Sequence, residues 1–194
     1  TIEPGSNVQA QYGAVLLKAA GFSHAPPQPA DMDATFYSIG LASTGASNIG
    51  SGHTTSHAFQ KSCLDDDDSV NIERIGHRRW LLNPSMLYSG IGYAEGYHTT
   101  YAFDFSRPAA DVTYDFIAWP SAGVFPVEFA TRYTPWSITL NPAKYDIQAT
   151  RTGHTVTLTR VSDGRTWTLD ATDTNTVGEY FNADFGRYGV ANAF

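Results

Sequence analysis

The stretch GHRRWLLNP (76–84) marks the point where this 194-residue chain changes character. Residues 69–82 are helical in composition, at least in part, and the Asn-Pro dipeptide that follows is typical of a helix end, because the residue before proline avoids the α region. After Pro84 the segments 86–94 and 99–105 have the pattern of strands. The sequence therefore predicts helices before this point and mostly strands after it.

Three further segments upstream carry helical signals. In the first of them, apolar residues recur at helical spacing and Gly21 follows the last of them. Proline-rich and Gly/Ser-rich stretches separate the segments, and we expect loops there. The predicted helices are residues 6–20, 30–42 and 56–64, and the predicted loops are residues 22–29 and 43–55.

From about residue 111 onward, short β-rich segments follow one another at fairly even spacing, which is typical of a small sandwich or barrel. Ser162-Asp163-Gly164 predicts a hairpin turn between two of them. The fold class is therefore predicted as α+β, with one domain over residues 1–110 and a β-rich domain over residues 111–194. The expected strands are residues 112–119, 135–140, 145–151, 154–161, 165–171, 179–185 and 188–194.

Composition limits the class of partner. The chain has a net charge of −7, with 12 Lys and Arg against 19 Asp and Glu. This balance argues against nucleic acid, since phosphate binding requires clustered basic residues. No apolar run reaches the roughly 18 residues of a membrane span, so we expect no transmembrane segment. Cys63 is the only cysteine, which excludes an internal disulfide. We expect it to be a buried, unreactive residue.

The candidate chemistry lies in the histidines and in an acidic run. His77 lies within the quoted stretch, and His24 follows the first predicted helix. Imidazole is a common ligand of Zn²⁺ and also serves as an acid or base. The run Asp65–Asp68 reads as a solvated acidic loop. As an alternative, one of its carboxylates orients His77 or pairs with the arginines that follow.

Other patterns carry weaker signals. His53 and His57 are four residues apart, but the Glu of a metalloprotease motif is missing between them, so we expect both to be exposed. The tryptophans of the β-rich half suit a β core with strand-edge aromatics, or alternatively a sugar-binding face. We find neither a nucleophile elbow nor a phosphate-binding glycine loop. These tryptophans are Trp119, Trp136 and Trp167.

The quoted stretch, followed by SGIGYA (89–94), resembles the CAP superfamily of cysteine-rich secretory proteins, antigen 5 and pathogenesis-related 1 proteins. The similarity is greatest to its bacterial, cysteine-poor SCP-like extracellular branch. FSHAPP (22–27) is similar to the segment with the family's first histidine, and SNIG (47–50) is similar to its Glu-Asn-Ile/Leu segment. The resemblance covers residues 6–106 and implies a CAP-like α-β-α sandwich, followed here by the small β domain.

The resemblance also implies a site. In this family two histidines and two acidic residues line a cleft that can take a divalent metal ion. The histidines correspond to His24 and His77. The first acid is replaced here by Ser47, which precedes Asn48, and this departure weakens a Zn²⁺ site. The second acid falls within the acidic run, where Asp66 and Asp67 are the candidates.

The expected function is that of a secreted or cell-surface binding module. Its ligand would be a divalent metal, a small apolar molecule or glycan, or a component of a host or cell surface. The alternative is a metal-dependent hydrolase that acts on peptides or cell-wall material, with an Asp of the acidic run as the base. In a third hypothesis, the β-rich half is an adhesion module and provides the binding.

Overall fold

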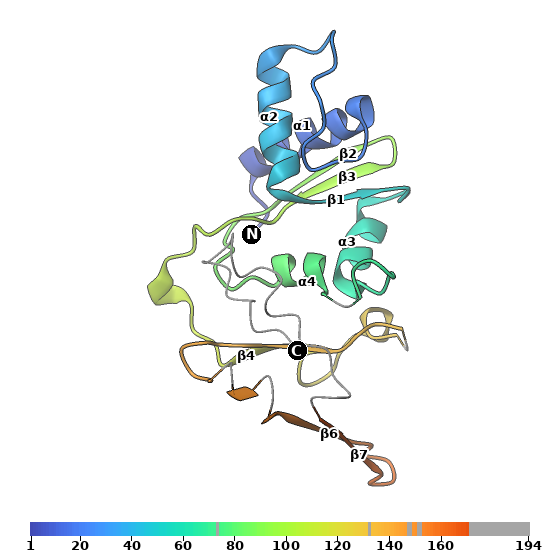
Figure 1. The fold of residues 1–194 in the computed structure, drawn as a ribbon, viewed down its shortest axis with the longest axis vertical. Helices are drawn as coiled ribbons and strands as arrows, with labels where there is room; N and C mark the ends of the chain where they lie inside the picture. Colours follow the sequence, from blue (N-terminus) through green and yellow to red (C-terminus); the bar gives the residue numbers. More distant parts are fainter. Residues whose placement is uncertain (73, 132, 147–148, 151–152, 171–194) are drawn as a thin grey trace. The chain divides into compact units, whose positions relative to one another are not determined.

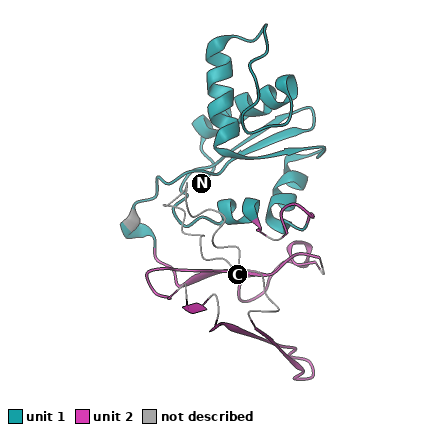
Figure 2. Cartoon of the chain, viewed as in Figure 1, with its two compact units in different colours: residues 1–67, 76–112 teal, residues 68–75, 113–194 magenta. Residues whose placement is uncertain are grey.

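The computed structural model describes residues 1–72, 74–131, 133–146, 149–150 and 153–170. Its helices and strands confirm the prediction of a mixed α+β fold. The chain divides into two compact units (Figure 2). Unit 1 comprises residues 1–67 and 76–112, and unit 2 comprises residues 68–75 and 113–194. The strands predicted at 179–185 and 188–194 lie outside the described residues.

Unit 1 contains four α-helices and a three-stranded sheet. Three of the helices begin at side-chain caps: Glu3 accepts the amide proton of Ser6, Asp33 that of Phe36, and Thr55 that of Ala58. None of the described helices is both long and apolar enough to cross a membrane. The elements are α1 (Pro4–Ala20), α2 (Ala34–Gly45), β1 (Ser47–Ser51), α3 (Ser56–Asp65), α4 (Gly76–Leu81), β2 (Gly90–Ala94), β3 (Tyr97–Tyr101) and the 3₁₀ turn η1 (Ala109–Asp111).

One prediction from the sequence is wrong in unit 1, and another is confirmed only in part. The predicted loop 43–55 contains β1, which pairs antiparallel with β3, and the sheet order is β1-β3-β2. Residues 69–82 were predicted to be helical at least in part, and the helix within them is α4, which begins at Gly76. Residues 69–72 form turns instead, because the Asp68 carboxylate accepts the amide protons of Val70 and Asn71 and thereby competes with helix formation.

Helix α1 packs closely on one face of the sheet. Gly90 and Gly92 of β2 make this possible, since a Cβ atom at either position would lie closer than 3.0 Å to the backbone of Ser6 or Ala10 in α1. Thr99 on β3 adds a hydrogen bond of 2.6 Å from its hydroxyl to the Ala10 carbonyl. Figure 1 shows α1 and α2 on this side of the sheet and α3 and α4 on the other.

The outer edge of β2 is hydrogen-bonded by side chains of α1. Asn7 accepts the amide proton of Ile91 at 2.8 Å. One turn later, Gln11 accepts the amide proton of Tyr93 and donates to its carbonyl oxygen. The two polar side chains thus take the place of a further strand. They satisfy an edge that would otherwise be open to pairing with another chain.

Substitution of Gln11 by Met should therefore lower the free energy of unfolding by about 1–2 kcal/mol, because two partly exposed hydrogen bonds are lost. Gln9→Met is the matched control, since no hydrogen bond of the Gln9 side chain is recorded among the described residues. Urea unfolding of the full chain measures both variants. Equal stabilities of the two variants would contradict this role of Gln11.

Helix α3 packs on the opposite face of the sheet. The side chains of Asn48, His98 and Thr100 lie on this face. Gln60 of α3 donates a hydrogen bond to the Thr100 hydroxyl. Phe59 lies against the backbone of Gly50 in β1, where a Cβ atom would meet the ring. This contact explains why a Gly/Ser-rich segment of low β propensity is held as a strand.

Unit 2 contains two separate strand pairs within the described residues. The predicted hairpin is confirmed, with Gly164 at a φ of 71° in its turn. The predicted strand 145–151 is wrong at residues 149–150, which are helical because Asp146 caps this turn through the amide of Ala149. The elements are β4 (Phe116–Trp119), η2 (Val127–Phe129), β5 (Ser137–Leu140), β6 (Thr155–Thr159) and β7 (Thr166–Asp170).

Candidate functional site

The four aspartates of the acidic run have four different environments. Two of the side chains are buried, and the other two are exposed. The run is therefore not a uniformly solvated loop, and its second residue is the one that reaches a histidine. Asp65 pairs with Lys61, Asp66 contacts His77, Asp67 is exposed, and Asp68 caps the turn that follows.

Asp66 and His77 form a hydrogen-bonded pair. Asp66 ends α3 in the left-handed conformation, with a φ of 45°, which Asp tolerates better than most residues. Its carboxylate is completely buried, and Oδ1 lies 2.8 Å from Nδ1 of His77. Because a carboxylate accepts, the proton is on Nδ1 and the lone pair of the neutral ring is on Nε2. The His77 side chain is 27% exposed.

Arg78 fixes the position of Asp66. Its amide donates to Asp66 Oδ2 at 2.9 Å, and its guanidinium donates to the carbonyl oxygens of Leu64 and Asp65 at the end of α3. The residue is only 1% exposed. Burial lowers the pKa of Arg78 to about 10, while the neighbouring carboxylates oppose this shift. Arg78 is therefore a buried cation that ties α3 to α4.

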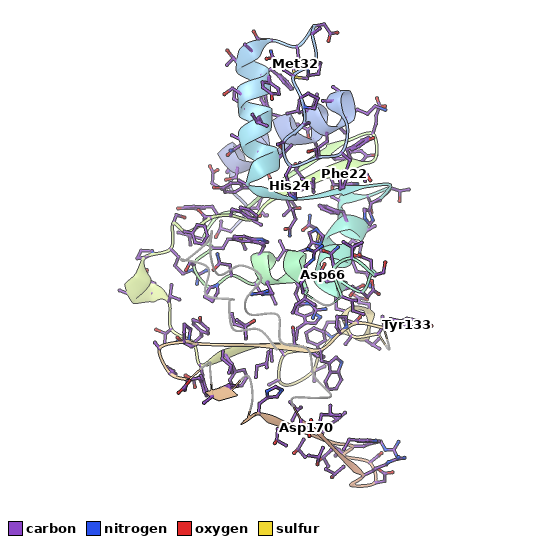
Figure 3. The ribbon with its side chains drawn as sticks, viewed as in Figure 1. Phe22, His24, Met32, Asp66, Tyr133 and Asp170 are labelled. Carbon is purple, nitrogen blue, oxygen red and sulfur yellow. The ribbon has the colours of Figure 1, made fainter. Side chains whose placement is uncertain are left out.

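His24 is also held by one ring nitrogen. Its Nδ1 donates to the carbonyl oxygen of Thr44 at 2.8 Å, and the Thr44 hydroxyl donates back to the carbonyl of His24. The residue is exposed, and Nε2 carries the lone pair of the neutral ring, as in His77. In Figure 3, His24 lies beside the end of α2, and Asp66 lies at the end of α3.

The segment 44–48 connects the two histidines. Thr44 binds His24, and Asn48 donates a hydrogen bond of 3.0 Å to the backbone carbonyl of His77. Ser47 is completely buried, and its hydroxyl has no hydrogen-bond partner within the described residues. His24 and His77 are therefore both anchored to a stretch of five residues.

The described residues include no group of three or more His, Cys, Asp or Glu side chains that could hold a metal ion. The Asp66 carboxylate accepts a hydrogen bond from Nδ1 of His77. This is the arrangement in which a carboxylate orients a metal-binding imidazole. Asp67 is exposed, and no contact with His77 is recorded for it. Of the residues predicted for the site, the structure joins His77 to Asp66 and Asn48, and it joins His24 to Thr44.

Cys63 behaves as the sequence predicts. It is 2% exposed, and burial raises the pKa of its thiol well above the usual value, with a further contribution from Asp66. Since the thiolate is the reactive form, Cys63 is a packing residue of α3 and not a nucleophile.

The histidines of the β1–α3 region are partly as expected. His57 is exposed, whereas His53 is half-buried and its ring lies near Phe59 and His98. His98 itself is completely buried on β3, and sequence reasoning missed it. Its position inside the β-rich stretch YHTTY (97–101) was the available signal, because a histidine inside such a strand must face one side of the sheet.

The tryptophans of unit 2 differ in exposure. Trp119 is half-buried and donates from Nε1 to the carbonyl of Phe129, and Trp167 lies under the guanidinium groups of Arg160 and Arg165. Trp136 is 61% exposed. Trp136 follows Pro135 and immediately precedes β5, so it is an exposed aromatic at the end of a strand.

Comparison with known proteins adds no relative: no family model, no curated protein and no solved structure matches this chain.

Proposed function

We propose that this protein is a secreted or cell-surface binding module of the CAP type, with the Nε2 atoms of His24 and His77 as its ligand-binding atoms. A divalent cation such as Zn²⁺ is the ligand that these atoms suit best. The observation that carries the proposal is the buried carboxylate of Asp66 behind His77, at 2.8 Å from Nδ1. Metal-binding histidines commonly have such a partner on the second ring nitrogen.

The same logic supports His24. A backbone carbonyl on Nδ1 is the other usual partner of a ligating imidazole, and Thr44 supplies it. Two histidines from different segments thus carry the same tautomer, with the lone pair on Nε2. Because Ser47 replaces the family's acidic residue, the remaining coordination positions would fall to water or to an external ligand.

A metal-dependent hydrolase is the second candidate, favoured by the same pair. In this reading Asp66 is a positioning residue, the Nε2 atoms of His24 and His77 would hold the ion, and an Asp of the acidic run would act as the base on water. The open coordination positions would supply the site for the substrate.

Substitution of Asp66 by Asn should weaken Zn²⁺ binding by about 10–100-fold, since the orienting carboxylate is lost while the side-chain volume is kept. The affinity is measured by calorimetric titration of the full chain with Zn²⁺. Asp67→Asn is the matched control, because it removes the same charge from the neighbouring, exposed position, and it should bind as the wild type does.

Two results would contradict the proposal. One is equal affinity of Asp66→Asn and Asp67→Asn, and the other is unchanged Zn²⁺ binding after His24 and His77 are both replaced by Ala. The hydrolase is tested separately, with a panel of peptides and peptidoglycan fragments in the presence of Zn²⁺. Turnover that depends on His77 would favour it, whereas no turnover by a protein that binds Zn²⁺ would leave the binding module.

A further inference from the structure

A second histidine environment lies away from His24 and His77, around His98 of β3. Its side chain is completely buried. The ring packs against Phe59 of α3 and Tyr93 of β2, with centroid distances of 5.1 and 4.8 Å. The ring of His53, from the loop between β1 and α3, lies edge-on at 5.9 Å. His98 thus joins the sheet, α3 and the loop that leads into α3.

One hydrogen bond fixes the protonation state of this ring. His98 Nε2 lies 2.9 Å from the backbone carbonyl oxygen of His53. The carbonyl accepts, so Nε2 carries a proton. The other nitrogen, Nδ1, is buried and has no hydrogen-bond partner within the described residues. A proton added at Nδ1 would therefore create a buried N–H donor without an acceptor.

The surroundings also lack compensation for a positive charge. The titratable groups that face the ring are His53 from the loop and Tyr93 from β2. The contacts from α3 and β1 are not titratable: they are Phe59 and Gly50, which lies opposite His98 in the sheet. Among the ion pairs of the described residues, none involves His98. Burial lowers the pKa of His53, and the adjacent His98 ring lowers it further.

We propose that His98 is a proton-sensitive lock, which holds the loop 52–55 and the start of α3 against the sheet at neutral pH and releases them in mild acid. Uptake of a proton at Nδ1 requires that the ring leave its aromatic site, and the bond to the His53 carbonyl is then lost. Because α3 ends at Asp66, release of its first turn would also loosen the pair with His77. This last consequence alone rests on the function proposed above.

The direction of the pH dependence follows from linkage. In the unfolded chain His98 takes up a proton below about pH 6.5. A second proton on the locked ring would be a buried donor without an acceptor within the described residues, so the unfolded state binds more protons and stability falls as the pH falls. The unfolding equilibrium constant should rise by about tenfold per pH unit below that point. Above pH 7.5 the ring is neutral in both states, and the contribution is independent of pH.

The test is urea unfolding of the full chain between pH 7.5 and pH 5.0, with a metal chelator present throughout. His98→Gln retains an amide donor near the position of Nε2 but has no titratable nitrogen. The ratio of the wild-type to the variant unfolding constant should increase by about 30-fold over this range. His57→Gln, which removes an exposed histidine, should leave the wild-type pH dependence nearly intact. A wild-type to His98→Gln ratio that stays constant with pH overturns the proposal.

A second measurement on the wild-type protein remains decisive if His98→Gln does not fold. The Cε1 proton resonance of His98 is followed by NMR together with the amide exchange of residues 52–55. The resonance should keep its neutral position until those amides lose protection, and both should then change together. Titration of the ring near pH 6.5 with the amides still protected would overturn the lock. Neither experiment involves Zn²⁺, so its outcome is independent of the metal site.

Discussion

Substitution of Arg78 by Met is expected to lower the free energy of unfolding by about 3–5 kcal/mol, the cost typical of removing one partner from a buried charged group. The guanidinium donates to the carbonyls of Leu64 and Asp65, at 2.5 and 2.6 Å, and is 1% exposed. Met fills much of the same volume but leaves both carbonyls without these donors. It also removes the buried positive charge that lies near the carboxylate of Asp66.

Arg107→Met is the control for this experiment, because Arg107 is exposed and its recorded side-chain bond is to the carbonyl of Met86. Its loss should cost at most about 1 kcal/mol. Arg78→Lys should recover part of the loss, since it restores the charge without the planar fork that reaches two carbonyls. The prediction fails if urea unfolding gives Arg78→Met and Arg107→Met the same stability.

Substitution of Gly92 by Ala is expected to destabilise unit 1 by about 3 kcal/mol or more, through overpacking. A Cβ atom there would lie closer than 3.0 Å to the carbonyl oxygen of Ala10 and to the amide nitrogen of Gln11. Both are backbone atoms in the middle of α1, which cannot move singly. The helix would therefore have to shift away from the sheet, and the hydrogen bond from Thr99 to Ala10 would be lost.

Gly45→Ala is the matched control, since the nearest atom to the added Cβ is the His24 carbonyl oxygen, at 3.9 Å. Gly45 lies in the last turn of α2, where Ala has the higher helix propensity, so this variant should equal or slightly exceed the wild type in stability. Thermal unfolding of the full chain measures both. A Gly92→Ala variant within about 0.5 kcal/mol of the wild type would show that α1 does not pack on β2 as described.

The local signals in the sequence were reliable where short-range chemistry decides the structure. The helical spacing of α1, the hairpin at Ser162-Asp163-Gly164 and the burial of Cys63 were all predicted. They depend on neighbouring residues alone: side-chain periodicity, a glycine at positive φ, and an apolar helix face. Within residues 69–82, predicted to be helical at least in part, residues 69–72 form turns because the local cap at Asp68 outweighed the composition of the segment.

The sequence by itself thus determined a mixed α+β chain, the approximate helices and hairpin, and His24 and His77 as the residues to examine. Only the tertiary structure decided that Asp66, and not Asp67, meets His77, that Arg78 is buried, that residues 47–51 form a strand, and that His98 lies in an aromatic site. Each of these depends on partners from other segments, such as Asp66 and His77, which are 11 positions apart in the sequence, and His53 and His98, which are 45 positions apart. Burial and hydrogen-bond pairing across such separations are properties of the packed chain, and no local pattern specifies them.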